Sequence, residues 1–481
     1  MHLVALVNAP TSQYAESWRH PLSRGDWLGA SFYADLARTL ERGRFDMIFF
    51  PDALAVPEDA AGDYATTVRT GGKGAIYLDP VTLATVAASA TTHLGVGATM
   101  STTFLPPYAI ARTMLSLDHL SGGRTAWNVV TSTTDAEARN MGLSAMPSKA
   151  ARYDRADRVV RTVLDLWDSW GPDALVLDRE RRMFADPAHV HRVPDTGASA
   201  EADADAGAGA GAGADPEAVA LSRGPVTLPR SPQGRPVLMQ AGASERGRTF
   251  AARWAEVVFV VAEDAAAMRA LRTDLRARAA AWGRDPDDLR VLAAVQPVVA
   301  ATDDAARARL KEMAALLDER EILTMLGRLL HADDLDPDAR AADLLIAHRG
   351  ATGSEGFEDM LLRASRAEDL TVRELAQRQA ISQLKPQPTG SPATVADELC
   401  AIVDAEAADG FVVMSALYPS SLTEFVDGVV PELQRRGRLR RDYRGGTLRE
   451  HLAPGAPPGR TADQPSAQPP GHRPTATSPD S

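Results

Sequence analysis

The chain has 481 residues, 44% of them hydrophobic, with 52 basic and 64 acidic side chains and a formal net charge of −12. This acidic balance argues against general nucleic-acid binding, which needs a positive field. With Cys400 as the one cysteine, no intrachain disulfide forms, and because the sequence shows no signal peptide and no membrane-spanning apolar run, we expect a cytoplasmic protein.

Short apolar runs alternate with segments of helical periodicity along most of the chain. The runs, which predict strands, cover 3–9, 45–51, 94–102, 125–132, 235–242, 255–262, 289–298 and 410–416. The helical segments lie near 30–43, 80–92, 108–121, 150–170, 245–254, 264–282, 304–383, 393–409 and 421–436. Most of the runs are continuously apolar, which is typical of parallel strands covered on both faces. The pattern favours an α/β fold, a (β/α)8 TIM barrel, over an open doubly wound sheet, because no G-x-G-x-x-G follows the first strand.

Two segments lack the apolar residues needed for a packed core. Residues 195–220 contain an Ala-Gly-Asp tract, which predicts a flexible insertion in the barrel. Residues 453–481 are rich in Pro, Gly, Ser and Thr, which predicts a disordered tail. We therefore expect one barrel domain over 1–452.

The active site of such a barrel lies at the carboxyl ends of its strands. This rule selects polar residues at Asn8–Gln13, Asp52, Thr99–Thr103, Asn128–Ser132, Gln240–Ser244, Glu263, Gln296 and Ser415. The set contains no carboxylate pair spaced for acid–base work, no metal-ligand motif and no hydrolase elbow, so no metal is expected. Neutral polar groups of this kind suit a bound heterocycle that carries its own chemistry.

Three of these residues have two interpretations each from the sequence alone. Ser244, where a strand leads into a helix, either helps to hold a phosphate or caps the helix. Asp52 either accepts a hydrogen bond from a ring N–H or caps a turn. Asn128 either contacts a ligand or makes a buried structural hydrogen bond.

The longest motifs of the chain resemble those of the bacterial luciferase-like flavin monooxygenases. The resemblance is strongest to the branch that contains nitrilotriacetate monooxygenase, dibenzothiophene sulfone monooxygenase and the oxygenase component of pristinamycin synthase. It extends over about residues 1–452, apart from the insertion. The motifs that carry it are Arg42–Asp46, Phe50–Asp52, Asp118–Arg124, Trp127–Ser132, Asp135–Asn140, Gln240–Ser244, Ala407–Phe411, Val430–Gln434 and Thr447–Arg449.

The resemblance implies a (β/α)8 barrel that uses reduced FMN, supplied by a separate NAD(P)H:flavin reductase, and O2. In this family oxygen adds at C4a of the flavin, and the resulting (hydro)peroxide oxygenates a small organic substrate. The implied FMN contacts are Asp52 and Thr99 at the isoalloxazine, Tyr153 at the ribityl-phosphate end, and Ser244 with Gly242 and Ala243 at the phosphate. Asn128 and Ser132 would lie beside the flavin, and a homodimer or homotetramer is expected.

The sequence departs from the family pattern near the expected mouth. Lys149 stands where many relatives have a histidine that contacts the flavin, and a lysine there can still pair with a phosphate. Gln13 stands near the first-strand histidine of sulfone-oxidising relatives, and His331 is offset from their second histidine. A different group or a different substrate is therefore expected, with Gln13, His20 and Asn128 as catalytic candidates.

Two alternatives share the same barrel: a deazaflavin-dependent oxidoreductase, which moves hydride without oxygen, and a non-catalytic flavin-binding subunit. Lys73, in the glycine-rich stretch 71–74, could lie on a lid or bind an anionic substrate group. We expect both Lys73 and Lys149 in loops near the mouth.

Overall fold

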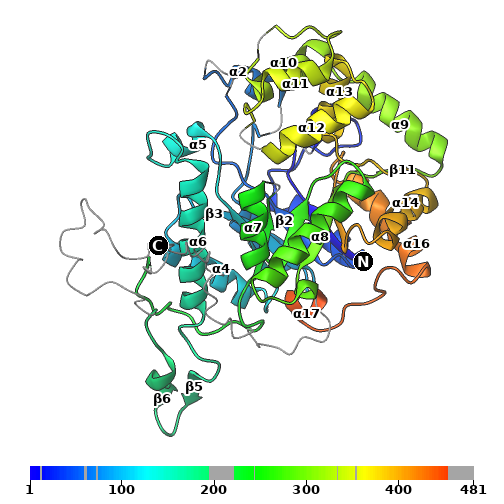
Figure 1. The fold of residues 1–481 in the computed structure, drawn as a ribbon. Coiled ribbons are helices and arrows are strands. Elements are labelled where there is room, and N and C mark those ends of the chain that lie inside the picture. Colours follow the sequence, from blue (N-terminus) through cyan, green and yellow to red (C-terminus); the bar gives the residue numbers. More distant parts are fainter. Residues whose placement is uncertain are drawn as a thin grey trace, which may run out of the picture.

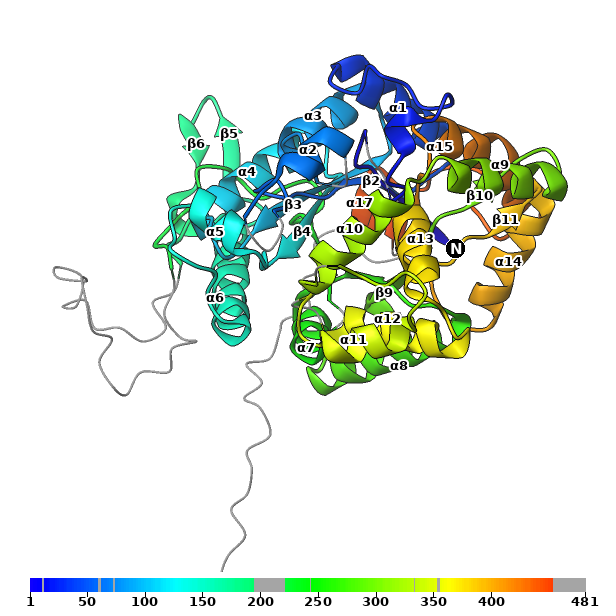
Figure 2. The same cartoon turned by 90° about the horizontal axis from the view of Figure 1, so that it is seen from above.

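The computed structural model describes residues 1–10, 13–58, 62–71, 74–193, 221–242, 244–332, 334–352 and 355–452. Eight parallel strands form a closed barrel in the order β1-β12-β9-β8-β7-β4-β3-β2, with helices around it (Figures 1 and 2). The predicted (β/α)8 barrel is confirmed, and each barrel strand overlaps one of the eight predicted runs. The strands are β1 (His2–Leu6), β2 (Met47–Phe50), β3 (Gly95–Ser101), β4 (Thr125–Val130), β7 (Val237–Ala241), β8 (Val257–Val260), β9 (Arg290–Val295) and β12 (Gly410–Met414).

The helices that surround the barrel follow the predicted segments closely. They are α1 (Ala30–Arg42), α3 (Pro80–Ala90), α4 (Pro107–Leu120), α6 (Lys149–Trp167), α7 (Glu245–Trp254), α8 (Ala265–Ala281) and α14 (Pro392–Asp404). The last predicted segment is a composite of α15 (Ser420–Glu424), the π-helical turn η4 (Phe425–Val429) and α16 (Val430–Arg435). Short elements at the ends of the barrel are η1 (Ser17–Arg19), α2 (Ala65–Thr70), α5 (Asp135–Asn140), η2 (Pro187–His189), η3 (Pro286–Asp288) and α17 (Leu448–Leu452).

The long segment 304–383, predicted only as helical, is divided into five helices. They are α9 (Asp303–Ala315), α10 (Glu319–Leu330), α11 (Ala341–Ala347), α12 (Glu355–Ala367) and α13 (Val372–Ser382), and a short parallel pair, β10 (Val298–Val299) and β11 (Thr389–Gly390), flanks them. Helices α10 to α13 share an apolar core of their own that includes Leu326, Leu361 and Leu375. Figure 1 shows them with α2 at the end of the barrel opposite α17, so they cover the mouth.

Alternate residues of each strand pack on opposite sides of the barrel wall. Leu3 and Ile48 pack outward in the layer shared with the helices, whereas Val4 and Met47 belong to a second cluster that fills the interior. Leu448 and Leu452 of α17 join this interior cluster and close the bottom of the barrel. The filled interior and the closed bottom leave the carboxyl ends of the strands as the open end.

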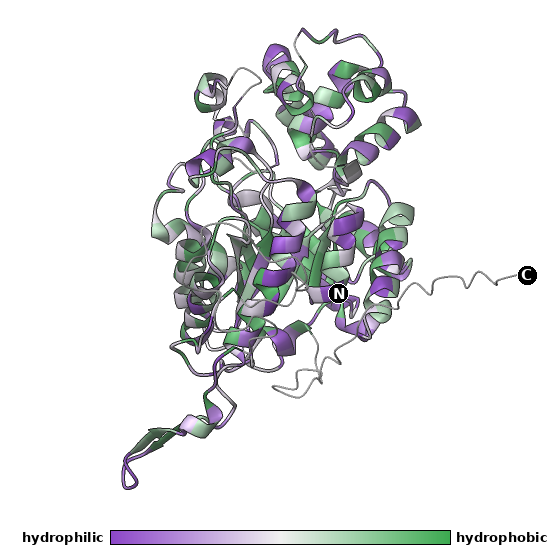
Figure 3. Ribbon diagram, turned by 60° about the vertical axis from the view of Figure 1, so that its left-hand side comes forward, coloured by the Kyte–Doolittle hydropathy of each residue, from purple (hydrophilic) through white to green (hydrophobic). Residues whose placement is uncertain are grey.

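A hairpin of β5 (Leu175–Asp178) and β6 (Met183–Ala185) extends away from the barrel (Figures 1 and 3). Its apolar side chains are exposed, by 59% at Leu177 and by 68% at Phe184. The segments expected to be a flexible insertion, 195–220, and a disordered tail, 453–481, lie outside the described residues.

Candidate functional site

A cavity of about 300 Å³ opens at the carboxyl ends of β2, β3, β4 and β7. This is the position that the strand-end rule predicts for the active site of a barrel. Its lining combines cationic, hydroxyl and amide groups with a few apolar side chains. The lining residues are Asp52, Leu54, Ser101, Val129, Val130, Thr131, Ser132, Thr133, Glu137, Lys149, Arg152, Tyr153, Gln240, Ala241, Gly242 and Ser244.

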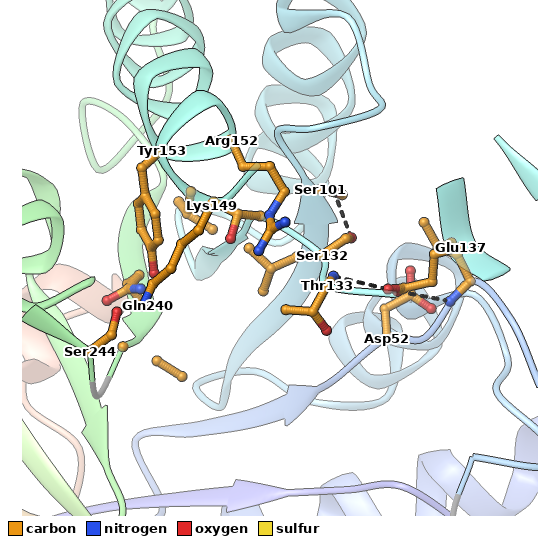
Figure 4. A pocket seen from close by; sticks show the side chains of 16 residues that line it. Asp52, Ser101, Ser132, Thr133, Glu137, Lys149, Arg152, Tyr153, Gln240 and Ser244 are labelled. Carbon is orange, nitrogen blue, oxygen red and sulfur yellow. Dashed lines mark hydrogen bonds between the residues drawn. The ribbon is translucent and has the colours of Figure 1, made fainter. Parts of the chain in front are cut away.

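The first turn of α6 supplies Lys149, Arg152 and Tyr153 to one end of the cavity (Figure 4). The helix begins at Ser148, whose hydroxyl accepts the Ala151 N–H, so positions i, i+3 and i+4 share one face. Arg152 is only 9% exposed, and its Nη1 donates to the Pro147 carbonyl at 2.6 Å. Its Nε has no hydrogen-bond partner within the described part of the chain. A buried guanidinium with a spare donor at a cavity wall is suited to an anion.

The N-terminus of α7 faces this group from across the cavity. Ser244 caps the helix by accepting the Gly247 N–H at 3.2 Å. A Cβ at Gly247 would stand 2.9 Å from the Tyr153 hydroxyl and 3.1 Å from the Ser244 hydroxyl, so these two hydroxyls converge over the glycine. The helix N-terminus adds its partial positive charge. Both interpretations of Ser244 are therefore compatible, since a capping hydroxyl here also lies at an anion cradle.

Aromatic and charged neighbours fix the ring of Tyr153. The Arg246 guanidinium lies 5.5 Å from the ring centroid, and the Phe250 ring packs edge-on at 5.7 Å between centroids. Arg246 is in turn paired with Asp157, which is 3% exposed. Burial raises the pKa of the Tyr153 phenol, so the hydroxyl remains protonated and can donate.

Thr99 and Asn128 lie side by side on β3 and β4, in the strand layer next to the cavity. Asn128 Nδ2 donates to the Thr99 hydroxyl at 3.0 Å, and that hydroxyl donates to the Phe50 carbonyl at 2.9 Å. Neither side chain lines the cavity, and the Asn128 Oδ1 is buried without a partner among the residues described. The Oε1 atom of Gln240, on β7, is in the same position. Two buried amide oxygens thus remain as acceptors for N–H donors.

Asp52 occupies the opposite end of the cavity from α6, beside Glu137 (Figure 4). Burial raises the pKa of its carboxyl to about 6, although the Ala53 N–H favours the charged form. Glu137 is held by the N-terminus of α5, where its carboxylate accepts the N–H groups of Thr133 and Thr134 at 3.1 Å. Asp52 is therefore the acceptor of this pair that a ligand could engage.

The other predicted residues lie apart from this cavity. Gln13 is 5% exposed and accepts a hydrogen bond from the ammonium of Lys385 at 2.9 Å. His20 is also 5% exposed, its Nδ1 accepts the Leu22 N–H at 3.2 Å, and burial lowers its pKa. Ala243 and Lys73 lie outside the described residues. The prediction of Lys149 in a loop was wrong, because it is the first residue of α6.

Arg152, Gln240 and Glu137 line the cavity but were not predicted as site residues. Arg152 precedes Tyr153 and follows Lys149 by three positions, so helical spacing alone could have grouped it with them. Gln240 and Glu137 carry no such signal, since one lies within an apolar strand and the other resembles an ordinary helix cap.

This site is chemically suited to a phosphate-bearing heterocycle. The buried Arg152, Lys149 and the start of α7 match the charge of a phosphate. The unpaired amide oxygens of Asn128 and Gln240, together with Asp52, match the N–H groups of a polar ring.

Residues 15–409 match the family described as luciferase-like monooxygenase. The chain belongs to this family. It is 42% identical over 459 residues to a dibenzothiophene-sulfone monooxygenase of Rhodococcus erythropolis (strain XP), covering 94% of this chain and 96% of the relative. The chain is therefore a monooxygenase of the luciferase-like type.

Solved structures agree with the family. The crystal structure of DmoA from Hyphomicrobium sulfonivorans has a TM-score of 0.80 at 31% identity, covering 96% of this chain and 93% of that one. The structure of a riboflavin lyase with modified FMN and riboflavin has a TM-score of 0.79 at 30% identity, covering 95% of this chain and 96% of that one. In the described ranges, no helix of this monooxygenase has the length and apolarity to cross a membrane.

Proposed function

We propose that this luciferase-like monooxygenase binds reduced FMN, delivered by a separate NAD(P)H:flavin reductase, and inserts one atom of O2 into a small organic substrate. The observation that carries the proposal is the cavity with a cationic cradle at one end and Asp52 at the other. When bound, the reduced flavin supplies the activation of O2. The chain itself binds, orients and shields.

The phosphate end of FMN is assigned to the cradle. Lys149 and Arg152 balance the phosphate charge, and the hydroxyls of Tyr153 and Ser244 donate to its oxygens. Gly242 lets the chain pass close by, since a Cβ there would stand 2.6 Å from the Gln240 side chain. Lys149 thus takes the place of the histidine found in many relatives, as a charge that stays fixed through neutral pH.

The ring end is assigned to the strand layer. The Asp52 carboxylate, the Asn128 Oδ1 and the Gln240 Oε1 accept from ring N–H groups, and Thr99 fixes the Asn128 amide by accepting from it. Helices α10 to α13 cover the mouth and exclude water from the reacting end. The riboflavin lyase relative, whose structure carries modified FMN, supports FMN as the flavin.

The test is a coupled assay with the full chain, FMN, NADH, a heterologous flavin reductase and ¹⁸O2. We expect micromolar affinity for reduced FMN under anaerobic conditions and ¹⁸O in the product of a turned-over substrate. Lys149→Met should weaken FMN binding by about tenfold or more, as expected for a lost charge-assisted contact. Lys311→Met, which removes an exposed lysine of α9, is the matched control.

The alternatives give different results in the same assay. Tighter binding of a deazaflavin than of reduced FMN would identify the hydride-transfer alternative. Binding of reduced FMN without any ¹⁸O transfer in a single turnover across sulfone, sulfide and aminocarboxylate substrates would identify a non-catalytic flavin-binding protein. Failure to bind reduced FMN at all would reject the proposal.

A further inference from the structure

Lys385 is a buried ammonium at the mouth of the barrel. Of Lys149, Lys311 and Lys385, only Lys385 is buried, at 7% exposed. Its Nζ donates to the Gln13 Oε1 at 2.9 Å and to the Gln383 Oε1 at 2.8 Å. It also lies 3.4 Å from the Ser382 carbonyl at the end of α13. Burying a charge is costly, so a sequence retains such a residue where it has a task or strong partners.

The backbone is strained where it turns this lysine inward. Gln383 and Leu384 both have left-handed φ angles, +53° and +55°, although neither is glycine. Consecutive non-glycine residues in this region cost free energy, and such strain gathers at functional sites. The turn ends α13 so that the negative end of the helix dipole, at the Ser382 carbonyl, faces the ammonium. The connection is therefore built to hold a cation in this place.

Topology places the lysine across the barrel from the phosphate cradle. Gln13 follows β1, and the N–H of Gln296, just after β9, donates to the Pro386 carbonyl next to Lys385 at 2.9 Å. In the ring, β1, β12 and β9 stand opposite β7, β4 and their neighbours, which carry the cradle. A cofactor whose phosphate lies at the cradle therefore directs its ring toward the side of Gln13 and Lys385.

The ammonium fixes the orientation of the Gln13 amide. A lysine can only donate, so the amide oxygen must face it. The amide nitrogen, with its N–H donors, then lies on the other edge of the planar group. Gln13 thus presents donors, and the buried positive charge behind it strengthens their attraction for an acceptor.

We infer that Lys385 is a positioning residue that, through Gln13, makes the mouth selective for a substrate whose reacting end carries hydrogen-bond-accepting oxygens, such as a sulfonyl group. This inference rests on the proposed function, because it places the substrate between the flavin ring and the β1–β9 side of the mouth. The 42% identity to a dibenzothiophene-sulfone monooxygenase makes an aromatic sulfone the first probe.

The experiment compares dibenzothiophene sulfone with dibenzothiophene, which has the same rings without the sulfonyl oxygens. Binding to the full chain with FMN bound is measured by calorimetry. We expect the wild type to prefer the sulfone, and Lys385→Met to reduce that preference by about tenfold, the usual effect of a hydrogen bond assisted by a charge. FMN affinity should not change. In turnover, KM for the sulfone should rise more than kcat falls, as for a lost binding interaction.

Two further variants keep the inference falsifiable. Gln13→Glu keeps an oxygen for Lys385 but removes the N–H donors, so it should reduce the preference as strongly as Lys385→Met while the protein stays folded. Lys311→Met, the same substitution at an exposed site, should leave the preference within about twofold. Equal binding of sulfone and dibenzothiophene by the wild type, or an unchanged preference in Gln13→Glu, overturns the inference. Loss of FMN binding in the wild type would instead reject the proposed function.

Discussion

Asp52 is a residue at which stability and binding oppose each other. Burial raises the pKa of its carboxyl to about 6 from 3.8, so the folded state disfavours the charge. Below about pH 4 the group is neutral in both the folded and unfolded states, and no penalty arises. The penalty grows as the pH rises toward 6 and is complete above it. A ligand N–H that donates to the carboxylate would offset this cost.

Asp52→Asn should therefore stabilise the ligand-free protein at pH 8 by about 1–2 kcal/mol, discounted from a shift of this size because the side chain is only partly buried. At pH 4 the two proteins should be nearly equal in stability. The same variant should bind FMN about tenfold more weakly at pH 8. Urea denaturation at both pH values and FMN titration check these outcomes, and a stabilisation that is larger at pH 4 would contradict the pKa assignment.

Gly247 is the residue that allows Tyr153 and Ser244 to meet. Gly247→Ala places a methyl group 2.9 Å from the Tyr153 hydroxyl, so that hydroxyl must move. We expect FMN affinity to fall by about tenfold, a lost hydrogen bond to a charged group, while the helix gains up to about 1 kcal/mol in propensity. Gly25→Ala, where a Cβ would meet nothing within 4 Å, is the control. Unchanged FMN affinity in Gly247→Ala would place the phosphate elsewhere.

Some site residues were predictable from the sequence and others were not, for definable reasons. Ser244 and Asp52 could be found because strand ends and a helix start mark them in the chain. Arg152 was missed because arginines are abundant in this sequence, so one more on a helix carries little information. The pairing of Gln13 with Lys385 links residues 372 positions apart, and no local pattern encodes it.

At the scale of elements, the barrel strands were predictable because both of their faces are buried. Their runs stay apolar over several residues, as in β12, where every residue is buried. The β5–β6 hairpin was not predicted, since its strands are short and alternate between exposed and half-buried positions. Helices α10 to α13 pack on one another, so their boundaries depend on contacts between helices more than on the sequence of each.

The β5–β6 hairpin should be dispensable for the stability of the barrel. Its two ends meet where the Asp186 N–H donates to the Ala174 carbonyl at 2.8 Å. Replacement of Leu175–Ala185 by Asn-Gly, a tight-turn sequence, should change the free energy of unfolding by less than about 0.5 kcal/mol. Because exposed apolar groups are removed, solubility should rise. Denaturant titration and light scattering test this, and a marked loss of stability would show that the hairpin packs on the barrel.

At the scale of the whole molecule, α17 is a small element with a large effect. Leu448 and Leu452 fill the bottom of the barrel, Arg449 forms an ion pair with Glu256, and Arg290 donates to the Leu452 carbonyl at 2.8 Å. Removal of two buried leucines and a half-buried ion pair leaves a cavity beneath every strand.

A chain that ends at residue 445 should therefore be less stable than one that ends at 452 by about 4 kcal/mol or more, since a single buried leucine replaced by alanine already costs about 2–5 kcal/mol. The chain ending at 452 should match the full chain, because residues 453–481 are predicted to be disordered. Denaturant unfolding of the three chains measures this. Equal stability of the 445 and 452 chains would show that the barrel needs no plug.

The closure of the barrel joins the two ends of the sequence. β1 pairs with β12 as well as with β2, and the Tyr418 hydroxyl donates to the Leu6 carbonyl, 412 residues away. During synthesis at about 5–20 residues per second, the first strand therefore waits roughly 20–80 s for its partner. Over that time β1 presents an unpaired, apolar edge, which is the feature that promotes aggregation. Protection of the nascent chain by a chaperone, more than the final stability of the barrel, should therefore determine how much of this protein a cell can produce.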